Sequence, residues 1–115
     1  MKPASESGEI WHYIHGYDER YRISNFGRIH SCERFVEDKN GVVRRIPDRI
    51  LKPRISRKRD HNIRLCEDCE QTIFVIGRLV WEHFVSIDVP VMVGHKDGNP
   101  GNNHVDNLYR RGEGV

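Results

Sequence analysis

Long hydrophobic runs are absent from this sequence, and that absence limits where the chain can work. No apolar stretch reaches the roughly 18 residues that a membrane-spanning helix requires. Residues 1–8 are polar, unlike the start of a secretory leader. We therefore expect a disordered leader over residues 1–8, no membrane partner and a cytoplasmic location.

Cysteine is also scarce. Three cysteines among 115 residues, an odd number, argue against the disulfide framework of a small secreted domain. Cys66 and Cys69 form a C-x-x-C pair, but a structural zinc ion would need two further ligands. Cys32 and His61 could be suggested as the missing pair, with little to support them. A hairpin turn in a reducing compartment is the simpler interpretation, so structural zinc is not expected.

Acidic residues are few in the middle of the chain, where basic residues gather. The formal net charge is only +2, yet residues 44–64 hold nine basic and two acidic residues. A solvated surface can carry such an excess without a function, but the excess favours a polyanionic partner such as nucleic acid. Arginine in particular suits forked contacts to phosphate and guanine. The residues expected to contact the nucleic acid here are Arg44, Arg45, Arg54, Arg57, Lys58 and Arg59.

The N-terminal quarter is dense in aromatic residues and isoleucine. Residues 21–24 and 28–31 are typical of two strands joined by a turn at residues 25–27. Alternation along the first strand places Tyr21 and Ile23 on one face. These side chains would give a small antiparallel sheet its apolar anchor.

This block resembles the small DNA-binding module of phage and intron-encoded HNH homing endonucleases. The usual pattern of that module is E-I-W-x-x-I-x-G-Y-x-x-x-Y-x-I-S-N-x-G-R-I-x-S. The landmarks present here are Glu9, Ile10, Trp11, Ile14, Gly16, Tyr17, Tyr21, Ile23, Ser24, Asn25, Gly27, Arg28, Ile29 and Ser31. The resemblance implies binding to double-stranded DNA, with Arg20, Arg22 and Arg28 free to contact phosphate or a groove.

Two further hairpins are predicted. Asn40 and Gly41 lie between two apolar pairs, which is a strong turn signal for a hairpin within residues 33–48. Residues 62–65 and 72–75 flank the Cys66 turn and are typical of a second hairpin.

One helix is predicted over residues 76–84. Apolar residues at positions 76, 79, 80 and 84 have helical spacing. Gly77 stands where the similar family usually has His, and it weakens the helix start by up to about 1 kcal/mol against Ala. A short apolar strand, residues 91–93, then leads into His95.

The segment around His95 carries the second recognisable pattern. Residues 94–108, G-H-K-D-G-N-P-G-N-N-H-V-D-N-L, place one titratable group at the mouth of a loop rich in Asn and Gly. Imidazole accepts a proton readily near neutral pH. The segment resembles the core of the HNH nucleases. The resemblance implies that His95 is the general base that activates water against a DNA phosphate, and that Asn107 ties the loop and fixes the histidine.

The same resemblance implies a divalent metal, Mg²⁺ or Mn²⁺, but the expected ligands depart from the family pattern. The residue before His95 is Gly94, which offers no side-chain ligand, and the last member of the triad would fall at position 116. Asp97 is the candidate ligand that remains, although an Asx turn is the simpler role for it. Glu113 in the tail, His104 and Asn103 are weaker candidate ligands.

These patterns predict an α+β fold. A small antiparallel β-sheet module with a basic loop, residues 9–60, should precede a truncated ββα-metal (HNH) unit, residues 61–115. The predicted function is that of a phage-type HNH endonuclease, working in the host cytoplasm as a monomer or homodimer. The alternative is a catalytically inactive HNH-like phage factor that binds DNA or a host protein and acts on host machinery.

Overall fold

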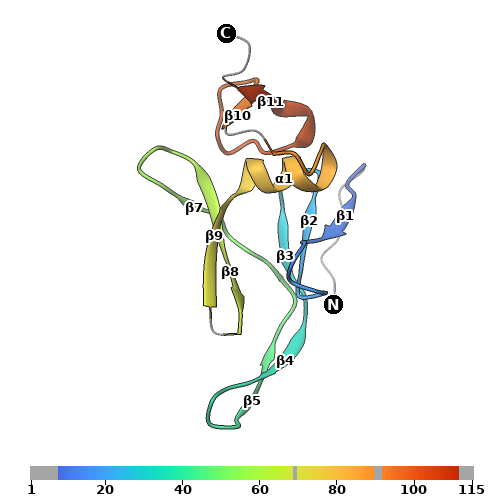
Figure 1. The fold of residues 1–115 in the computed structure, drawn as a ribbon, viewed down its shortest axis with the longest axis vertical. Helices are drawn as coiled ribbons and strands as arrows, with labels where there is room; N and C mark the ends of the chain where they lie inside the picture. The colour runs from blue at the N-terminus through green and yellow to red at the C-terminus, as the bar shows by residue number, and fades with distance from the viewer. Residues whose placement is uncertain (1–7, 69, 90–91, 112–115) are drawn as a thin grey trace.

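A computed structural model of the chain describes residues 8–68, 70–89 and 92–111. These residues form eleven short strands, one α-helix and one turn of 3₁₀ helix, in an elongated body of 54 × 30 × 25 Å (Figure 1). The predicted sheet-rich fold with a single helix is confirmed. Among the described residues, no helix combines the length and the apolar character needed to cross a lipid bilayer.

The N-terminal sheet contains four antiparallel strands in the order β1-β2-β3-β6. They are β1 (Trp11–Tyr13), β2 (Tyr21–Ser24), β3 (Ile29–Ser31) and β6 (Arg49–Ile50). The alternation predicted for β2 is confirmed, because Tyr21 and Ile23 are buried. The predicted turn is also present, and the Ser24 hydroxyl accepts the backbone N–H groups of Phe26 and Arg28.

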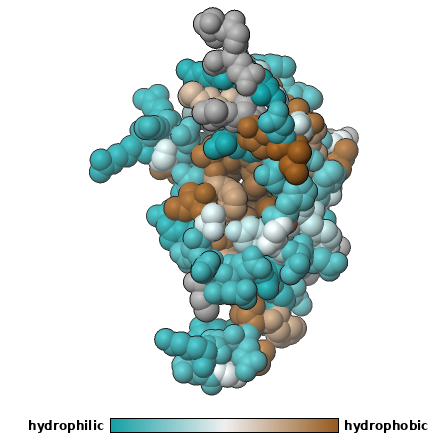
Figure 2. All heavy atoms as spheres, viewed as in Figure 1, coloured by the Kyte–Doolittle hydropathy of each residue, from teal (hydrophilic) through white to brown (hydrophobic). Residues whose placement is uncertain are grey.

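A separate hairpin extends from this sheet and protrudes at one end of the molecule (Figure 1). Its strands are β4 (Arg34–Glu37) and β5 (Val43–Ile46), as the Asn-Gly turn predicts. The Asp38 carboxylate closes the turn by accepting the N–H groups of Asn40 and Val42 at 2.8 and 3.0 Å. Hydrophobic side chains are visible on this hairpin in Figure 2, and Phe35 is 68% exposed.

The middle of the chain forms a three-stranded sheet followed at once by the helix. Its strands are β7 (Arg54–Ile55), β8 (His61–Glu67) and β9 (Glu70–Val75). The predicted hairpin and helix are both confirmed, since β8 pairs with β9 and α1 spans Ile76–Phe84. No side chain caps the helix start.

The last elements are a second two-stranded ribbon and the turn that connects it. Strand β10 (Met92–His95) pairs antiparallel with β11 (Leu108–Arg111), and the 3₁₀ turn η1 (Val105–Asn107) lies between them. Figure 1 shows this ribbon packed beside α1. His95 ends β10 and lies opposite Leu108.

A single hydrophobic core joins these parts, except the β4–β5 hairpin. Buried residues of the N-terminal sheet, strand β8, helix α1 and β11 belong to one cluster. They include Ile23, Leu65, Val80 and Leu108, each 5% exposed or less. Because burying apolar area is the main stabilising term, the two predicted modules depend on each other for their stability.

Candidate active site and nucleic-acid interface

His95 stands at the mouth of a compact loop that Asp97 organises. The Asp97 carboxylate accepts the backbone N–H of Asn99 and the side-chain amides of Asn102 and Asn107, at 2.8 to 2.9 Å. These donors, Asn102 first and then the Asn99 N–H, lower the pKa of Asp97 from 3.8 to about 2. A carboxylate offers about four lone-pair positions, and three of them are already used here. Asp97 therefore shapes the loop, as an Asx turn does.

Asn107 ties the two ends of the loop together. Its side-chain oxygen accepts the Asp97 N–H at 3.2 Å, and its amide group donates to the Asn102 carbonyl at 2.8 Å. The side chain that touches the His95 ring is a different one. Asn103 Oδ1 lies 2.8 Å from His95 Nε2. The sequence indicates Asn103 only as a weaker candidate metal ligand, since its place in a run of asparagines does not tell which one faces the ring.

Gly94 is held by close packing. It lies opposite Tyr109 across the ribbon, and a Cβ added at Gly94 would lie 2.4 Å from Tyr109 Cζ and 2.7 Å from the hydroxyl oxygen. The Tyr109 ring therefore fills the space that a side chain at position 94 would need.

A groove of about 570 Å³ opens beside His95. The basic loop between β7 and β8, the start of α1 and the β10–β11 ribbon all contribute to its walls. The cationic side chains that line it are Lys58, Arg59, Arg78 and Arg111. A groove of this charge concentrates anions next to the imidazole.

The predicted DNA-contacting residues divide into two groups. Arg54, Arg57, Lys58 and Arg59 are exposed, and none of them makes an ion pair with another residue that the structure describes. Arg44 and Arg45 are also exposed, on β5, although Asp38 and Glu33 lie 3.8 and 2.9 Å from their guanidinium groups.

The three N-terminal arginines predicted to contact DNA, Arg20, Arg22 and Arg28, are less free than expected. Arg20 lies 3.3 Å from a carboxylate oxygen of Glu67. Arg22 donates to a ring nitrogen of His30, and Arg28 pairs with Glu9. Arg22 and Arg28 also both lie over the Trp11 ring. Any DNA contact by these three must compete with such internal partners.

The three zinc candidates that the structure describes, Cys32, His61 and Cys66, do not form a group of metal-ligating atoms. His61 packs against Gly101 of the His95 loop, where an added Cβ would lie 2.9 Å from the His61 ring. Cys32 lies beside His30 instead, with its Sγ atom 3.6 Å from His30 Nδ1. Cys69 and Glu113 lie outside the described residues.

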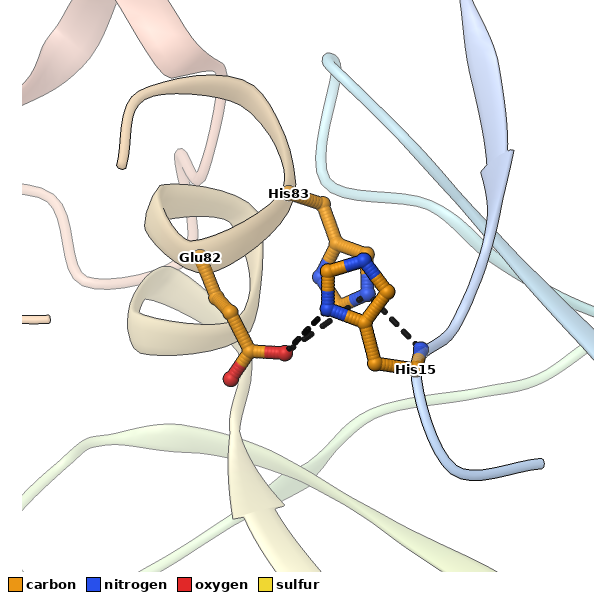
Figure 3. Close-up of side chains that lie close together, drawn as sticks. All are labelled: His15, Glu82 and His83. Atoms are coloured by element: carbon orange, nitrogen blue, oxygen red, sulfur yellow. Dashed lines mark hydrogen bonds and ion pairs between the residues drawn. The ribbon is translucent and has the colours of Figure 1, made fainter. Parts of the chain in front are cut away.

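A second cluster of titratable groups joins the first sheet to α1 (Figure 3). His15 Nδ1 lies 3.0 Å and His83 Nε2 lies 3.8 Å from the same oxygen of Glu82. His83 Nδ1 donates to the Leu79 carbonyl at 2.8 Å, so Nε2 is the unprotonated nitrogen of the neutral ring. The lone pair of His83 Nε2 already accepts the backbone N–H of His15 at 3.0 Å. A metal ion bound to the lone pair of His83 Nε2 would collide with the His15 backbone. The cluster of His15, Glu82 and His83 therefore has a structural role, because it links the loop after β1 to α1.

Comparison with known proteins identifies the family. Residues 9–66 match the NUMOD4 motif. The chain is 33% identical over 99 residues to DNA endonuclease I-HmuI of Bacillus phage SP01, a match that covers 85% of this chain and 49% of that protein. The solved structure described as "DNA binding and cleavage by the HNH homing endonuclease I-HmuI" gives a TM-score of 0.66 at 33% identity, covering 86% of this chain and 50% of the other.

The chain belongs to the NUMOD4-containing HNH homing endonucleases. The family resemblance drawn from the sequence is therefore confirmed. The chain spans about half the length of the relative that it matches.

HNH homing endonucleases in general depend on a divalent metal, and the residues around His95 fit one poorly. Hard cations such as Mg²⁺ and Mn²⁺ need several oxygen ligands. Beside His95, position 94 has no side chain, and Asp97 is engaged by three donors. Among the described residues, the only three His, Cys, Asp or Glu side chains with ligand atoms close together are His15, Glu82 and His83, and none of the three belongs to the loop around His95. No catalytic step is therefore assigned to a cation.

Proposed function

We propose that this chain binds duplex DNA and presents His95 to a backbone phosphate as the general base of an HNH-type endonuclease. The observation that carries the proposal is the position of His95 in a groove lined by four cationic side chains. Under this proposal, β10 and β11 are the two strands of a ββα-metal unit, and Asn107 is the residue that keeps its loop closed.

The proposed chemistry follows from the groups on the groove wall. A neutral imidazole removes a proton from water, and the resulting hydroxide attacks the phosphorus while the 3′ oxygen leaves and takes a proton from solvent. Negative charge builds on the phosphate oxygens in the transition state. Arg78 and Arg59, whose side chains line the groove, would stabilise that charge by hydrogen bonding and electrostatic attraction.

The basic loop supplies the proposed affinity. Arg54, Arg57 and Lys58 are exposed on or next to the turn that joins β7 to β8, and this turn forms one side of the groove. Duplex phosphates bound along this loop would bring the backbone toward His95. Such contacts give affinity without sequence preference.

A second candidate function is DNA binding without cleavage. The packing of Tyr109 against Gly94 favours it, because that packing removes the position next to His95 from which a side chain could hold a metal. A non-cleaving protein would act by occupying DNA or by contacting a host protein while bound.

One experiment separates the two candidates. Supercoiled plasmid is incubated with the chain and Mg²⁺ or Mn²⁺, with His95→Ala as the matched control, and DNA affinity is measured in parallel by fluorescence anisotropy. Nicking by the wild type that His95→Ala abolishes, at similar affinity, is the expected result for the endonuclease. Tight binding with no nicking under either metal would refute the endonuclease and support the second candidate.

A further inference from the structure

The contact between Asn103 and His95 determines which ring nitrogen can act as a base. Asn103 is 5% exposed, and its Nδ2 group donates to the Pro100 carbonyl at 3.3 Å. A carbonyl can only accept, so this contact fixes which end of the amide carries hydrogen. The amide oxygen must then face His95 Nε2, which lies 2.8 Å away and must donate. Nδ1 is therefore the ring nitrogen with a free lone pair.

Two glycines from distant parts of the chain pack closely against Asn103. A Cβ added at Gly27, in the turn between β2 and β3, would lie 2.8 Å from Asn103 Cβ and 3.0 Å from its carbonyl oxygen. A Cβ added at Gly77, in the first turn of α1, would lie 3.0 Å from Asn103 Oδ1 and 3.8 Å from His95 Nε2. Both approaches are too close for any larger residue without a shift of the asparagine. Gly77 is thus a close-packing residue as well as a weak helix former.

The turn at residues 25–27 makes further contacts with the same segment. The Asn25 carbonyl accepts the Val105 N–H at 2.8 Å. The rings of Phe26 and His104 lie 4.7 Å apart, tilted by 32°. These contacts hold His104 and Val105, the two residues that follow Asn103. The turn of the N-terminal sheet therefore fixes the backbone next to Asn103.

We propose that Asn103 is a positioning residue for His95, and that the 25–27 turn of the N-terminal module sets its place. The module expected to bind DNA then also aligns the imidazole, which couples the two halves of the chain. The catalytic meaning of this inference rests on the proposed endonuclease function, but the geometry can be tested without cleavage.

The first test is spectroscopic and uses the full chain labelled with ¹⁵N-histidine. In the wild type we expect a His95 Nε2–H proton that is protected from exchange with water, and an Nδ1 shift typical of an unprotonated nitrogen. Asn103→Ala should lose the protected proton. Asn99→Ala is the matched control, because Asn99 bonds the Gly101 N–H of the same loop and does not contact the ring. A protected proton that persists in Asn103→Ala overturns the proposal.

Gly77→Ala gives a second variant should Asn103→Ala fail to fold. The added methyl group presses on Asn103 Oδ1 from the helix side, so the His95 ring signals should shift and the Nε2–H proton should exchange faster. Unchanged His95 signals in folded Gly77→Ala would contradict the proposal.

The second test is kinetic and applies if the wild type nicks plasmid. Misplacing a reacting group by about 1 Å can cost about 10²-fold in rate, so Asn103→Ala should lower kcat by roughly 10- to 100-fold with DNA affinity changed less than about twofold. An unchanged kcat overturns the positioning role while the endonuclease stands. A wild type that never nicks removes the endonuclease, and the spectroscopic result then decides the positioning role alone.

Discussion

His83 is a buried histidine whose two ring nitrogens both have backbone partners. Burial lowers its pKa from the ordinary value of 6.5, and the facing His15 and His12 lower it further, while the Leu79 carbonyl and Glu82 oppose them. The folded protein thus keeps this ring neutral at pH values where the unfolded chain takes up a proton.

The free energy of unfolding should therefore fall as the pH drops below about 6.5, since protons then bind preferentially to the unfolded chain. Urea unfolding at pH 7.5 and pH 5.5 measures the change. His83→Gln should show a smaller fall over this range. Equal pH dependence in wild type and His83→Gln would contradict the assignment.

Gly94 shows at the same scale how one missing side chain can be a packing requirement. Gly94→Ala would place its methyl group 2.4 Å from the Tyr109 ring. We expect Gly94→Ala to lower the free energy of unfolding by about 1 kcal/mol, the low end of what overpacking costs, because Tyr109 is 41% exposed and its ring can turn outward.

A double-mutant cycle tests the cause of that loss. Tyr109→Ala removes the obstacle, so Gly94→Ala should cost markedly less in its presence, with a coupling energy close to the whole loss seen for Gly94→Ala alone. If the two changes have additive effects on the free energy of unfolding, measured by thermal unfolding, a steric clash with the Tyr109 ring is not the cause of the loss in Gly94→Ala.

At the scale of elements, the β4–β5 hairpin stands apart from the core. Phe35, Val36 and Val43 on its strands are exposed, and the hairpin pairs with no other described strand. Its order therefore comes from its own turn and ladder hydrogen bonds, and at its base from the Arg34 guanidinium, which donates to Ser31 and Tyr21 of the N-terminal sheet, rather than from apolar burial.

Asp38→Ala should consequently loosen this hairpin without unfolding the rest. The change removes the acceptor of the Asn40 and Val42 N–H groups. Two net hydrogen-bond contributions of about 0.5–1 kcal/mol each predict roughly 5- to 30-fold faster hydrogen exchange along β5, with little change in global stability. Lys39→Ala at the same turn is the control. Unaltered exchange in Asp38→Ala would mean that the ladder alone orders the hairpin.

Considered as a whole molecule, the described part of the chain gathers four exposed cations without an ion pair to another described residue on β7 and the loop that follows it: Arg54, Arg57, Lys58 and Arg59. Neutralising Arg54, Arg57, Lys58 and Arg59 together should reduce the slope of log affinity against log salt by up to about 3 to 4 units, because each phosphate contact contributes about 0.9. The slope is measured by anisotropy titrations of duplex DNA between low and moderate salt. Thermal unfolding must show that the variant is folded, and an unchanged slope would remove this loop from the interface.

Several of the elements were predictable because their signals are local, whereas β1, β6 and β7 were not predicted. The Asn40-Gly41 turn, the alternation around Tyr21 and the helical spacing before Phe84 each reflect residues close in the chain, and the structure contains all three elements. The NUMOD4 pattern is local too, so the family could be proposed before any contact was known.

The candidate site was only partly predictable. His95 and Asn107 stand out in the sequence, and the structure places both on one loop. The contact of Asn103 with the ring, the ring of Tyr109 over Gly94 and the ion pair of Arg28 with Glu9 depend on how separate strands meet. The spacing of residues along the sequence does not predict contacts between side chains of separate elements.

The amino-acid order thus decided the strands, the turns, the helix and the excess of positive charge, since these depend on backbone preferences and composition. Tertiary packing decided which asparagine holds His95, which arginines remain free and whether a side chain fits at position 94. Those outcomes depend on distances between atoms from different elements, and such distances exist only once the shared core has formed.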